Sequence, residues 1–356
     1  PTPGLPDIRD AIVAKTKRDS NYEITADQVL VTNGGKQSVY QAFASIIDPG
    51  DEVLHPSPYW TTYPECVKLA GGVSVEIFAD ETQNYLVSVE QLEAARTPKT
   101  KALLFCSPSN PTGSVYSVEQ VKAIGEWAVK NNIWVISDEI YAQTTYDVTK
   151  FVSMGKIYPE GTFVTNGLSK SHAAGGYRLG YVVFPQHALD LKSQFKKILA
   201  TEYTAVSTPI QYAAVKGFEI SDEIDKYFEI TREIHKIMGD YVYDKLSNME
   251  GVKVTKPEAT FYLLADFNHY APELQAMKIN TSQKLSEALI VHPYHTAIVG
   301  GDSLVLERTD YSARIAFVDY DGAKVYENYQ KQKPKTQAER IEFAKTNAPR
   351  IAKETV

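Results

Sequence analysis

A lysine and an arginine lie eight residues apart in a glycine-rich segment that follows an apolar, strand-like run. The run covers residues 161–166, and the segment after it contains Lys170 and Arg178. Ligands of open α/β sheets bind where strands end. A lysine at such a place can form an imine (a Schiff base) with a carbonyl compound once its neighbours lower its pKa. An arginine can bind a phosphate through two of its N–H groups. For this segment alone, a solvated lysine in a loop is the plainer interpretation.

Two further polar groups follow apolar runs in the same way. Asn110 lies in a turn-forming sequence after the run 101–105, and its amide can donate a hydrogen bond to a phenolate oxygen. Asp138 closes the run 133–137, where it could pair with a protonated ring nitrogen and make that ring an electron sink. Tyr141 could add a second hydrogen bond at the phenolate. An ordinary turn and a helix N-cap are the plainer interpretations.

A glycine pair and a tryptophan complete the set. Gly34 and Gly35 stand before Lys36 at the start of a helical pattern, after the apolar run 28–32. Glycines at a helix N-terminus leave backbone N–H groups free to hold a phosphate. Trp60 follows the next strand-like run and could lie flat against a ring, although packing in a core is the commoner role of tryptophan.

These signals are weak one at a time, but they follow each other along one chain, each after an apolar run. In chain order they are the glycine pair that could bind a phosphate, the tryptophan, the asparagine turn, the aspartate with its tyrosine, and the lysine with its arginine. Strand ends meet at one edge of a parallel sheet, so we expect these side chains to converge there. The sequence therefore predicts an enzyme site for a phosphate-bearing, ring-shaped carbonyl cofactor.

The elements that must position these residues alternate between strand and helix patterns over the first two thirds of the chain. Continuously apolar runs joined by helices, such as those at 36–47 and 117–131, indicate a mostly parallel sheet covered by helices on both faces. The expected strands are residues 28–32, 52–55, 101–105, 133–137, 161–166 and 179–184. The predicted fold class is α/β.

The pattern changes after about residue 221. A long amphipathic stretch covers residues 222–249, short strand patterns follow at 261–264 and 312–317, and the tail from Tyr320 is helical and charged. We expect a large domain over residues 1–228 and a smaller α+β C-terminal domain over residues 229–356. A chain of 356 residues is long enough for two such domains.

The bulk composition fits an ordinary globular enzyme. Apolar residues make up 43% of the chain and charged residues 23%, and no run has the length of a bilayer-spanning helix. The net charge of −7 argues against a nucleic-acid surface. Cys66 and Cys106 form no metal-spaced pair, so we expect no metal site. A cytoplasmic location fits best, with no membrane partner.

The sequence resembles the fold-type-I pyridoxal-phosphate aminotransferases of class I/II over nearly its whole length. It is most similar to the bacterial aspartate (and prephenate) branch. The motifs that carry the resemblance are Gly34-Gly35-Lys36-Gln37, Asp48-Pro49-Gly50-Asp51-Glu52-Val53, Ser57-Pro58-Tyr59-Trp60, Asn110-Pro111-Thr112-Gly113, Ser137-Asp138-Glu139-Ile140-Tyr141 and Pro257-Glu258-Ala259-Thr260-Phe261-Tyr262.

The resemblance implies pyridoxal 5'-phosphate (PLP) as cofactor and assigns a role to each residue. Lys170, Asp138 and Tyr141 would be catalytic. Arg314 stands where the family binds the substrate α-carboxylate, and Lys36 where the aspartate branch approaches the distal carboxylate. Cofactor contacts would come from Gly34, Gly35, Lys36, Trp60, Asn110, Asp138, Tyr141, Ser169, Lys170 and Arg178. Substrate contacts would come from Arg314, Lys36, Trp60 and Asn110. Relatives also imply a homodimer and a cis Asn110–Pro111 bond.

The sequence departs from the family pattern at three places. The segment around Lys170 looks more like the alanine and tyrosine branches. Gly167 stands where many relatives carry a phosphate-binding serine, a role that Ser169 could take over. The chain begins at Pro1, just after the family tyrosine that reaches the partner subunit's phosphate, so we expect the N-terminal arm to be missing from it.

The expected function is amino-group transfer by a ping-pong cycle. Resemblance to the aspartate branch favours aspartate with 2-oxoglutarate as small-molecule substrates. The alternatives are an aminotransferase for alanine, aromatic amino acids or prephenate, and a PLP-binding sensor domain of a transcription regulator. The acidic composition and the complete set of site residues argue against the sensor.

Overall fold

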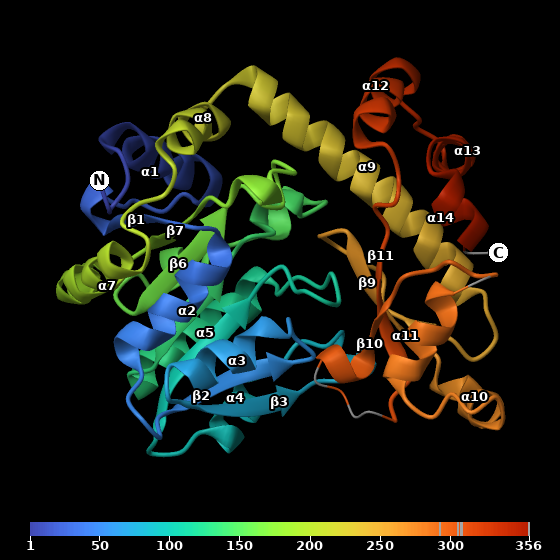
Figure 1. The fold of residues 1–356 in the computed structure, drawn as a ribbon, viewed down its shortest axis with the longest axis horizontal. Helices are drawn as coiled ribbons and strands as arrows, with labels where there is room; N and C mark the ends of the chain where they lie inside the picture. Colours follow the sequence, from blue (N-terminus) through green and yellow to red (C-terminus); the bar gives the residue numbers. More distant parts are fainter. Residues whose placement is uncertain (292, 305, 307–308, 355–356) are drawn as a thin grey trace.

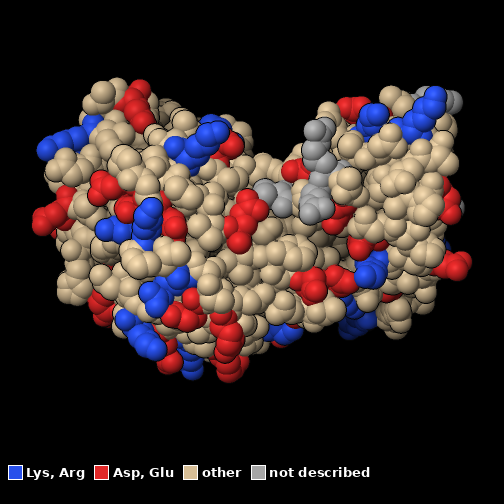
Figure 2. All heavy atoms as spheres, turned by 90° about the horizontal axis from the view of Figure 1, so that it is seen from below, with Lys and Arg blue, Asp and Glu red and all other residues tan. Residues whose placement is uncertain are grey.

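The computed structural model describes residues 1–291, 293–304, 306 and 309–354. The chain forms a larger lobe, which carries the N-terminus, and a smaller lobe, which carries the C-terminus (Figure 1). On the face drawn in Figure 2, a broad hollow separates the two lobes, and acidic and basic side chains are interspersed. In the described part of the chain, no helix has both the length and the apolarity needed to cross a bilayer.

Seven strands form the central sheet of the larger lobe, in the order β1-β7-β6-β5-β4-β2-β3. Strand β7 is antiparallel to both neighbours, and the other pairs are parallel. The predicted α/β class with a mostly parallel sheet is confirmed. The strands are β1 (Val29–Thr32), β2 (Glu52–Ser57), β3 (Val73–Phe78), β4 (Thr100–Cys106), β5 (Trp134–Asp138), β6 (Thr162–Gly167) and β7 (Gly180–Val183).

Helices cover both faces of this sheet. Leu104 belongs to a buried cluster with Phe43 of α2, whereas its neighbour Leu103 belongs to a second cluster with Trp127 of α5. Successive strand residues point to opposite faces, which explains why the strands are apolar throughout. The helices of this lobe are α1 (Pro6–Ser20), α2 (Gly35–Ile46), α3 (Thr62–Leu69), α4 (Val89–Ala95), α5 (Val118–Asn131), α6 (Met154–Ile157), α7 (Leu189–Glu202) and α8 (Thr208–Phe218).

Helix α5 shows how local sequence sets an element's ends. Ser117 caps its N-terminus by accepting a hydrogen bond from the Gln120 amide at 3.2 Å, and the Gln120 side chain accepts one from the Ser117 amide at 2.8 Å. This reciprocal pair satisfies two backbone donors that the helix leaves free. The helix ends before Asn132, which adopts the left-handed conformation with φ 54°.

The smaller lobe contains a four-stranded antiparallel sheet in the order β10-β11-β9-β8. Its strands are β8 (Lys253–Val254), β9 (Tyr262–Asp266), β10 (Val299–Gly300) and β11 (Ser312–Ala316). Its helices are α9 (Asp222–Ser247), α10 (Ala271–Ala276), α11 (Ser282–Ile290), α12 (Gly322–Gln332), α13 (Gln337–Asn347) and α14 (Pro349–Glu354). Helices α12, α13 and α14 lie along α9 (Figure 1).

Helix α9 belongs to both lobes. Near its start, the Phe228 ring contacts the His172 ring of the larger lobe, with centroids 5.0 Å apart. From Ile230 onward, its buried residues pack in the core of the smaller lobe. We therefore propose that the two domains meet within α9, near the predicted boundary between residues 228 and 229.

Candidate active site

The carboxyl ends of β4, β5 and β6 border a cavity of about 550 Å³ that also reaches β11 of the smaller lobe. Every residue expected in the site lines this cavity except Gly34, which directly precedes Gly35 in the chain. The lining residues are Gly35, Lys36, Trp60, Tyr63, Asn110, Asp138, Ile140, Tyr141, Ser169, Lys170, Gly175, Arg178, Tyr262 and Arg314. The convergence expected from the strand ends is therefore observed.

Asp138 ends β5 as a buried carboxyl group that accepts hydrogen bonds. The Tyr63 hydroxyl donates to it at 2.7 Å and the Ile140 amide at 3.2 Å. Burial raises the pKa of the Asp138 carboxyl above its usual range, although these hydrogen bonds and the nearby Lys170 oppose the shift. A cationic group in the cavity would favour the ionised form. Tyr63 is a site residue that the sequence analysis did not single out.

Lys170 reaches into an aromatic corner of the cavity. Its ammonium nitrogen lies 5.7 Å from the ring centroids of both Tyr141 and Phe261, a geometry that suits cation–π attraction. Tyr141 itself is buried, with its ring 6.0 Å from that of Tyr262. Burial raises the pKa of the Tyr141 hydroxyl well above its usual value, so this phenol is a hydrogen-bond donor at neutral pH.

The glycine pair leaves room for an arginine. A Cβ atom on Gly34 would lie 2.3 Å from an Arg178 guanidinium nitrogen, and Gly34 has a φ of +86°, which side chains other than glycine rarely adopt. Arg178 is turned toward the cavity from the left-handed conformation, with φ 51°, and donates to the Gly175 carbonyl at 2.8 Å. Helix α2 begins at Gly35, so a guanidinium and a helix N-terminus meet here.

Gly167, where the resemblance led us to expect a phosphate-binding serine, is a glycine that close packing requires. A Cβ atom there would lie 2.6 Å from the Leu179 carbonyl oxygen and 2.8 Å from the Gly180 Cα atom, because Gly167 pairs with Gly180 in the sheet. No side chain fits without moving strand β7. Ser169 lines the cavity two residues later.

Trp60 and Lys36 form one wall. The Lys36 ammonium lies 5.1 Å from the centroid of the Trp60 ring, and the Trp60 ring contacts Tyr63 edge-on at 5.4 Å. The tryptophan is half-buried and the lysine is exposed. Lys36 therefore sets a positive charge at the cavity rim, over an aromatic face.

Asn110 and Arg314 bring the two lobes together. The Arg314 guanidinium donates to the Asn110 side-chain oxygen at 2.9 Å and lies over the Tyr262 ring at 4.5 Å. Its Nε atom is buried without a hydrogen-bond partner among the described residues. A guanidinium with an unused donor at a cavity is suited to a carboxylate.

The predicted cis bond at Asn110–Pro111 is wrong. The cis bonds are Ser57–Pro58 and Ser107–Pro108, and Asn110–Pro111 is trans. Residues 109–113 form a single helical turn closed by a hydrogen bond from the Gly113 amide to the Ser109 carbonyl. The Asn110–Pro111 bond lies inside this turn, and a helical turn is built from trans peptide bonds.

The fold and the cavity together define a class of protein. A doubly covered, mostly parallel sheet presents a lysine, a buried aspartate, a phenol and an arginine at one edge, and the smaller lobe adds a second arginine. This set suits an enzyme that holds a phosphate-bearing carbonyl cofactor and a carboxylate substrate.

Comparison with known proteins is consistent with this class. The aminotransferase class I and II family model matches residues 1–322. An aspartate aminotransferase of Streptomyces avermitilis is 42% identical over 308 residues, which cover 85% of this chain and 74% of that protein. An aspartate/prephenate aminotransferase of Thermus thermophilus is 34% identical over 288 residues, which cover 81% and 72%. The chain therefore belongs to the aminotransferase class I and II family.

Solved structures show the same fold. The aspartate aminotransferase of Thermus thermophilus with maleate superposes with a TM-score of 0.82 at 30% identity, over 96% of this chain and 83% of that one. An aromatic aminotransferase of Pyrococcus horikoshii superposes with a TM-score of 0.81 at 27% identity, over 100% and 88%.

Proposed function

We propose that the cavity binds PLP and that the chain transfers amino groups between aspartate and 2-oxoglutarate. The observation that carries the proposal is the buried Asp138 carboxyl group, whose pKa burial raises. A carboxyl group held in this way calls for a cationic partner, which a protonated pyridine nitrogen supplies. Lys170, which lines the same cavity, offers the amine that a carbonyl cofactor needs.

The remaining residues suit the other parts of the cofactor. The Gly35 amide at the start of α2, Ser169 and Arg178 would hold the phosphate, since helix N-termini and guanidinium groups both favour anions. Asn110 and Tyr141 would donate to the ring hydroxyl, and Trp60 would lie against the ring. The cavity volume of about 550 Å³ lies within the range of cofactor sites.

When bound, PLP supplies a carbonyl for the amino group and a ring that withdraws electrons from the substrate Cα. Asp138 would keep the ring nitrogen protonated. Lys170 would take the proton from the substrate Cα as a general base and return it as an acid, which its amine can do when held within reach of that carbon. Arg314 and Asn110 would orient the α-carboxylate, and Tyr63 would hold Asp138.

A dicarboxylic substrate fits the cationic groups of the cavity. Arg314 would take one carboxylate and the flexible Lys36, at the rim, the other. Relatives across most of the chain carry the name aspartate aminotransferase, and one related structure contains maleate, a dicarboxylate. These matches favour aspartate over alanine or aromatic amino acids. We also infer a cytoplasmic homodimer, in which the exposed residues at the start of α8 would face the partner.

The test compares aspartate, alanine and phenylalanine with the wild type and two variants. Wild type should turn over aspartate with 2-oxoglutarate best, and Lys170→Ala should lose both turnover and borohydride trapping of PLP. Lys36→Ala should lower kcat/KM for aspartate roughly ten- to a hundredfold, the cost of one charged hydrogen bond, and should change the other two little. If PLP were still trapped in Lys170→Ala, Lys170 would not be the residue that binds the cofactor carbonyl. If Lys36→Ala lowered kcat/KM equally for all three amino acids, Lys36 would not determine the substrate specificity.

A further inference from the structure

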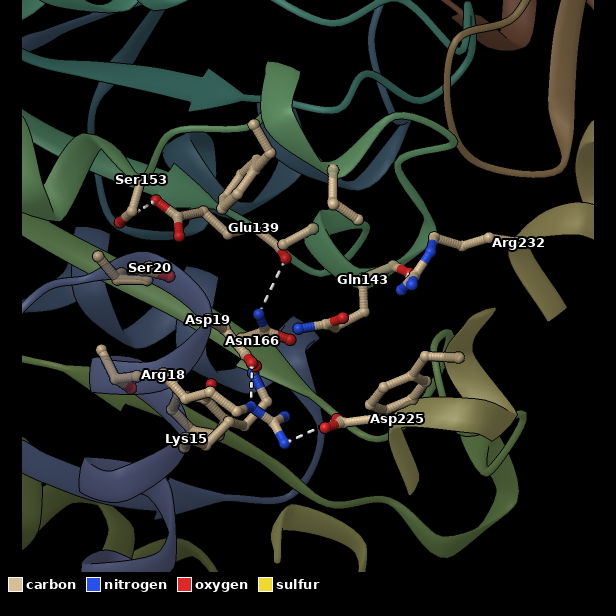
Figure 3. A pocket seen from close by; sticks show the side chains of 17 residues that line it. Lys15, Arg18, Asp19, Ser20, Glu139, Gln143, Ser153, Asn166, Asp225 and Arg232 are labelled. Atoms are coloured by element: carbon tan, nitrogen blue, oxygen red, sulfur yellow. Dashed lines mark hydrogen bonds and ion pairs between the residues drawn. The ribbon is translucent and has the colours of Figure 1, made fainter. Parts of the chain in front are cut away.

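A second cavity, of about 320 Å³, lies on the other side of the strand ends from the active site. The chain separates the two: Asp138 and Tyr141 line the active-site cavity, whereas Glu139 and Gln143 line the second one. No residue lines both. Helix α9 closes the second cavity with residues that include Phe228 and Arg232, as Figure 3 shows in part.

Most charges in this second cavity are already paired. Lys15 forms an ion pair with Asp19 at 3.0 Å, and Arg18 contacts both Asp19 and, at 2.9 Å, Asp225 of α9. Glu139 accepts hydrogen bonds from two serine hydroxyls and one backbone amide. These groups form a closed network and leave little for a ligand to bind.

Arg232 is the exception. Its guanidinium has five N–H donors, yet among the described residues it makes one long hydrogen bond, of 3.5 Å, to the Gln143 carbonyl. It forms no ion pair with any residue that the structure describes. Burial lowers the pKa of this half-buried guanidinium, and the carboxylates of Glu229 and Asp225, which are near but not paired with it, oppose the shift.

The Gln143 side chain offers a second group of free donors. Its amide extends into the cavity toward Asn166 (Figure 3), and it makes no hydrogen bond to the part of the chain that the structure describes. The neighbouring wall is apolar, formed by Phe151, Phe228 and Val148. The cavity thus combines a guanidinium fork, a primary amide and an aromatic surface.

We propose that this second cavity binds a small organic monocarboxylate with an apolar tail. The planar carboxylate matches the two-pronged guanidinium of Arg232, with the Gln143 amide as a further donor. The tail would lie against Phe151 and Phe228. The cavity is lined by three cations, Lys15, Arg18 and Arg232, and by three carboxyl groups, those of Asp19, Glu139 and Asp225. Lys15 and Arg18 form ion pairs, whereas Arg232 forms none with the described residues. Arg232 can therefore take one anionic group. The volume is that of a small ligand pocket.

The test titrates the holoenzyme with 3-phenylpropanoate, which has no amino or oxo group to react, and measures binding by calorimetry. Because Arg314 could also bind the probe in the active site, the titrations use the Arg314→Met background. This background should bind one equivalent. Adding Arg232→Met, which keeps the side-chain bulk, should weaken binding roughly ten- to a hundredfold, as loss of a charge-assisted contact does.

Two further variants keep the result interpretable. Lys226→Met removes a cation from the same helix outside the cavity and should leave the affinity unchanged. Gln143→Met changes the opposite wall and should also weaken binding, which covers the case that the arginine variant folds poorly. The proposal is overturned if the Arg314→Met protein binds no probe, or if both cavity variants bind it as tightly as that background.

Discussion

At the scale of single residues, the most demanding feature of the active site is the buried Asp138. A carboxylate removed from water is costly unless it is paired or hydrogen-bonded. Tyr63 supplies a hydrogen bond to it at 2.7 Å and is itself 1% exposed. The ionisation of Asp138 therefore depends on Tyr63 as well as on its cationic partner.

Tyr63→Phe should raise the pKa of Asp138, because removing a donor to a carboxylate disfavours the ionised form. The folded protein would then protonate Asp138 at higher pH, so the acid limb of the kcat/KM–pH profile should move upward. At neutral pH, kcat/KM should fall roughly tenfold or more, the cost of a hydrogen bond to a charged group. Steady-state kinetics between pH 5 and 9 would measure both effects.

Tyr59→Phe is the matched control. The Tyr59 hydroxyl also donates to a carboxylate, that of Glu76 at 2.6 Å, but Tyr59 does not line the active-site cavity. It should leave the pH profile in place. An acid limb that stays put in Tyr63→Phe would show that this phenol does not control Asp138.

At the scale of elements, apolar runs located most of the sheet. Six strands lie within two residues of their predicted bounds. Asp138 is the last residue of its strand, and Asn110 and Lys170 follow strand ends as expected. Strand β3 was not predicted: as an edge strand it is largely exposed, and Val73-Ser74-Val75-Glu76 is not a continuous apolar run. A buried strand can be recognised from its apolar run. An edge strand pairs with only one neighbouring strand and is partly exposed, so its sequence need not be apolar throughout.

Contacts between residues that lie far apart in the chain could not be predicted from the sequence, for a different reason. Tyr63 and Asp138 are 75 positions apart, and no local pattern states that they touch. The same holds for Gly180, whose backbone lies so close to that of Gly34 that a Cβ atom would not fit, and for Gly167, where Leu179 and Gly180 leave no room for one. The backbone turn at Asn110 also depends on hydrogen bonds formed only after folding.

The C-terminal helices are a part of the small domain core, although the family model ends at residue 322. Phe343 and Ile351, 2% and 4% exposed, pack with α9 residues. Phe343→Ala should therefore lower the free energy of unfolding by about 3–5 kcal/mol, as large cavities in cores do. Urea denaturation would measure the change.

Lys345→Ala serves as the control for Phe343→Ala. Lys345 lies two residues further along α13 and is exposed, so its loss should change the free energy of unfolding by no more than about 0.5 kcal/mol. If both variants were equally stable, the tail helices would be an appendage that the core of the small lobe does not need.

At the scale of the whole molecule, the carboxylate site is divided between the two lobes. Asn110 follows strand β4 of the larger lobe, and Arg314 lies on β11 of the smaller one. Further contacts across the same boundary include the Tyr146 hydroxyl donating to the Thr260 carbonyl at 2.9 Å and an ion pair of Lys150 with Glu258. A ligand that binds both Asn110 and Arg314 would add to this interface.

A non-reactive dicarboxylate such as maleate should therefore stabilise the whole holoenzyme. At a concentration of about 100 times its Kd, the expected gain in unfolding free energy is about 2.7 kcal/mol. Arg314→Met should lose most of this gain at the same concentration, because loss of a charged hydrogen bond weakens binding by about 1.5–3 kcal/mol. Arg340→Met, which breaks an ion pair with Glu233 inside the smaller lobe, should change the baseline stability but keep the gain. Thermal unfolding with and without maleate would measure both, and full stabilisation of Arg314→Met would place the carboxylate site elsewhere.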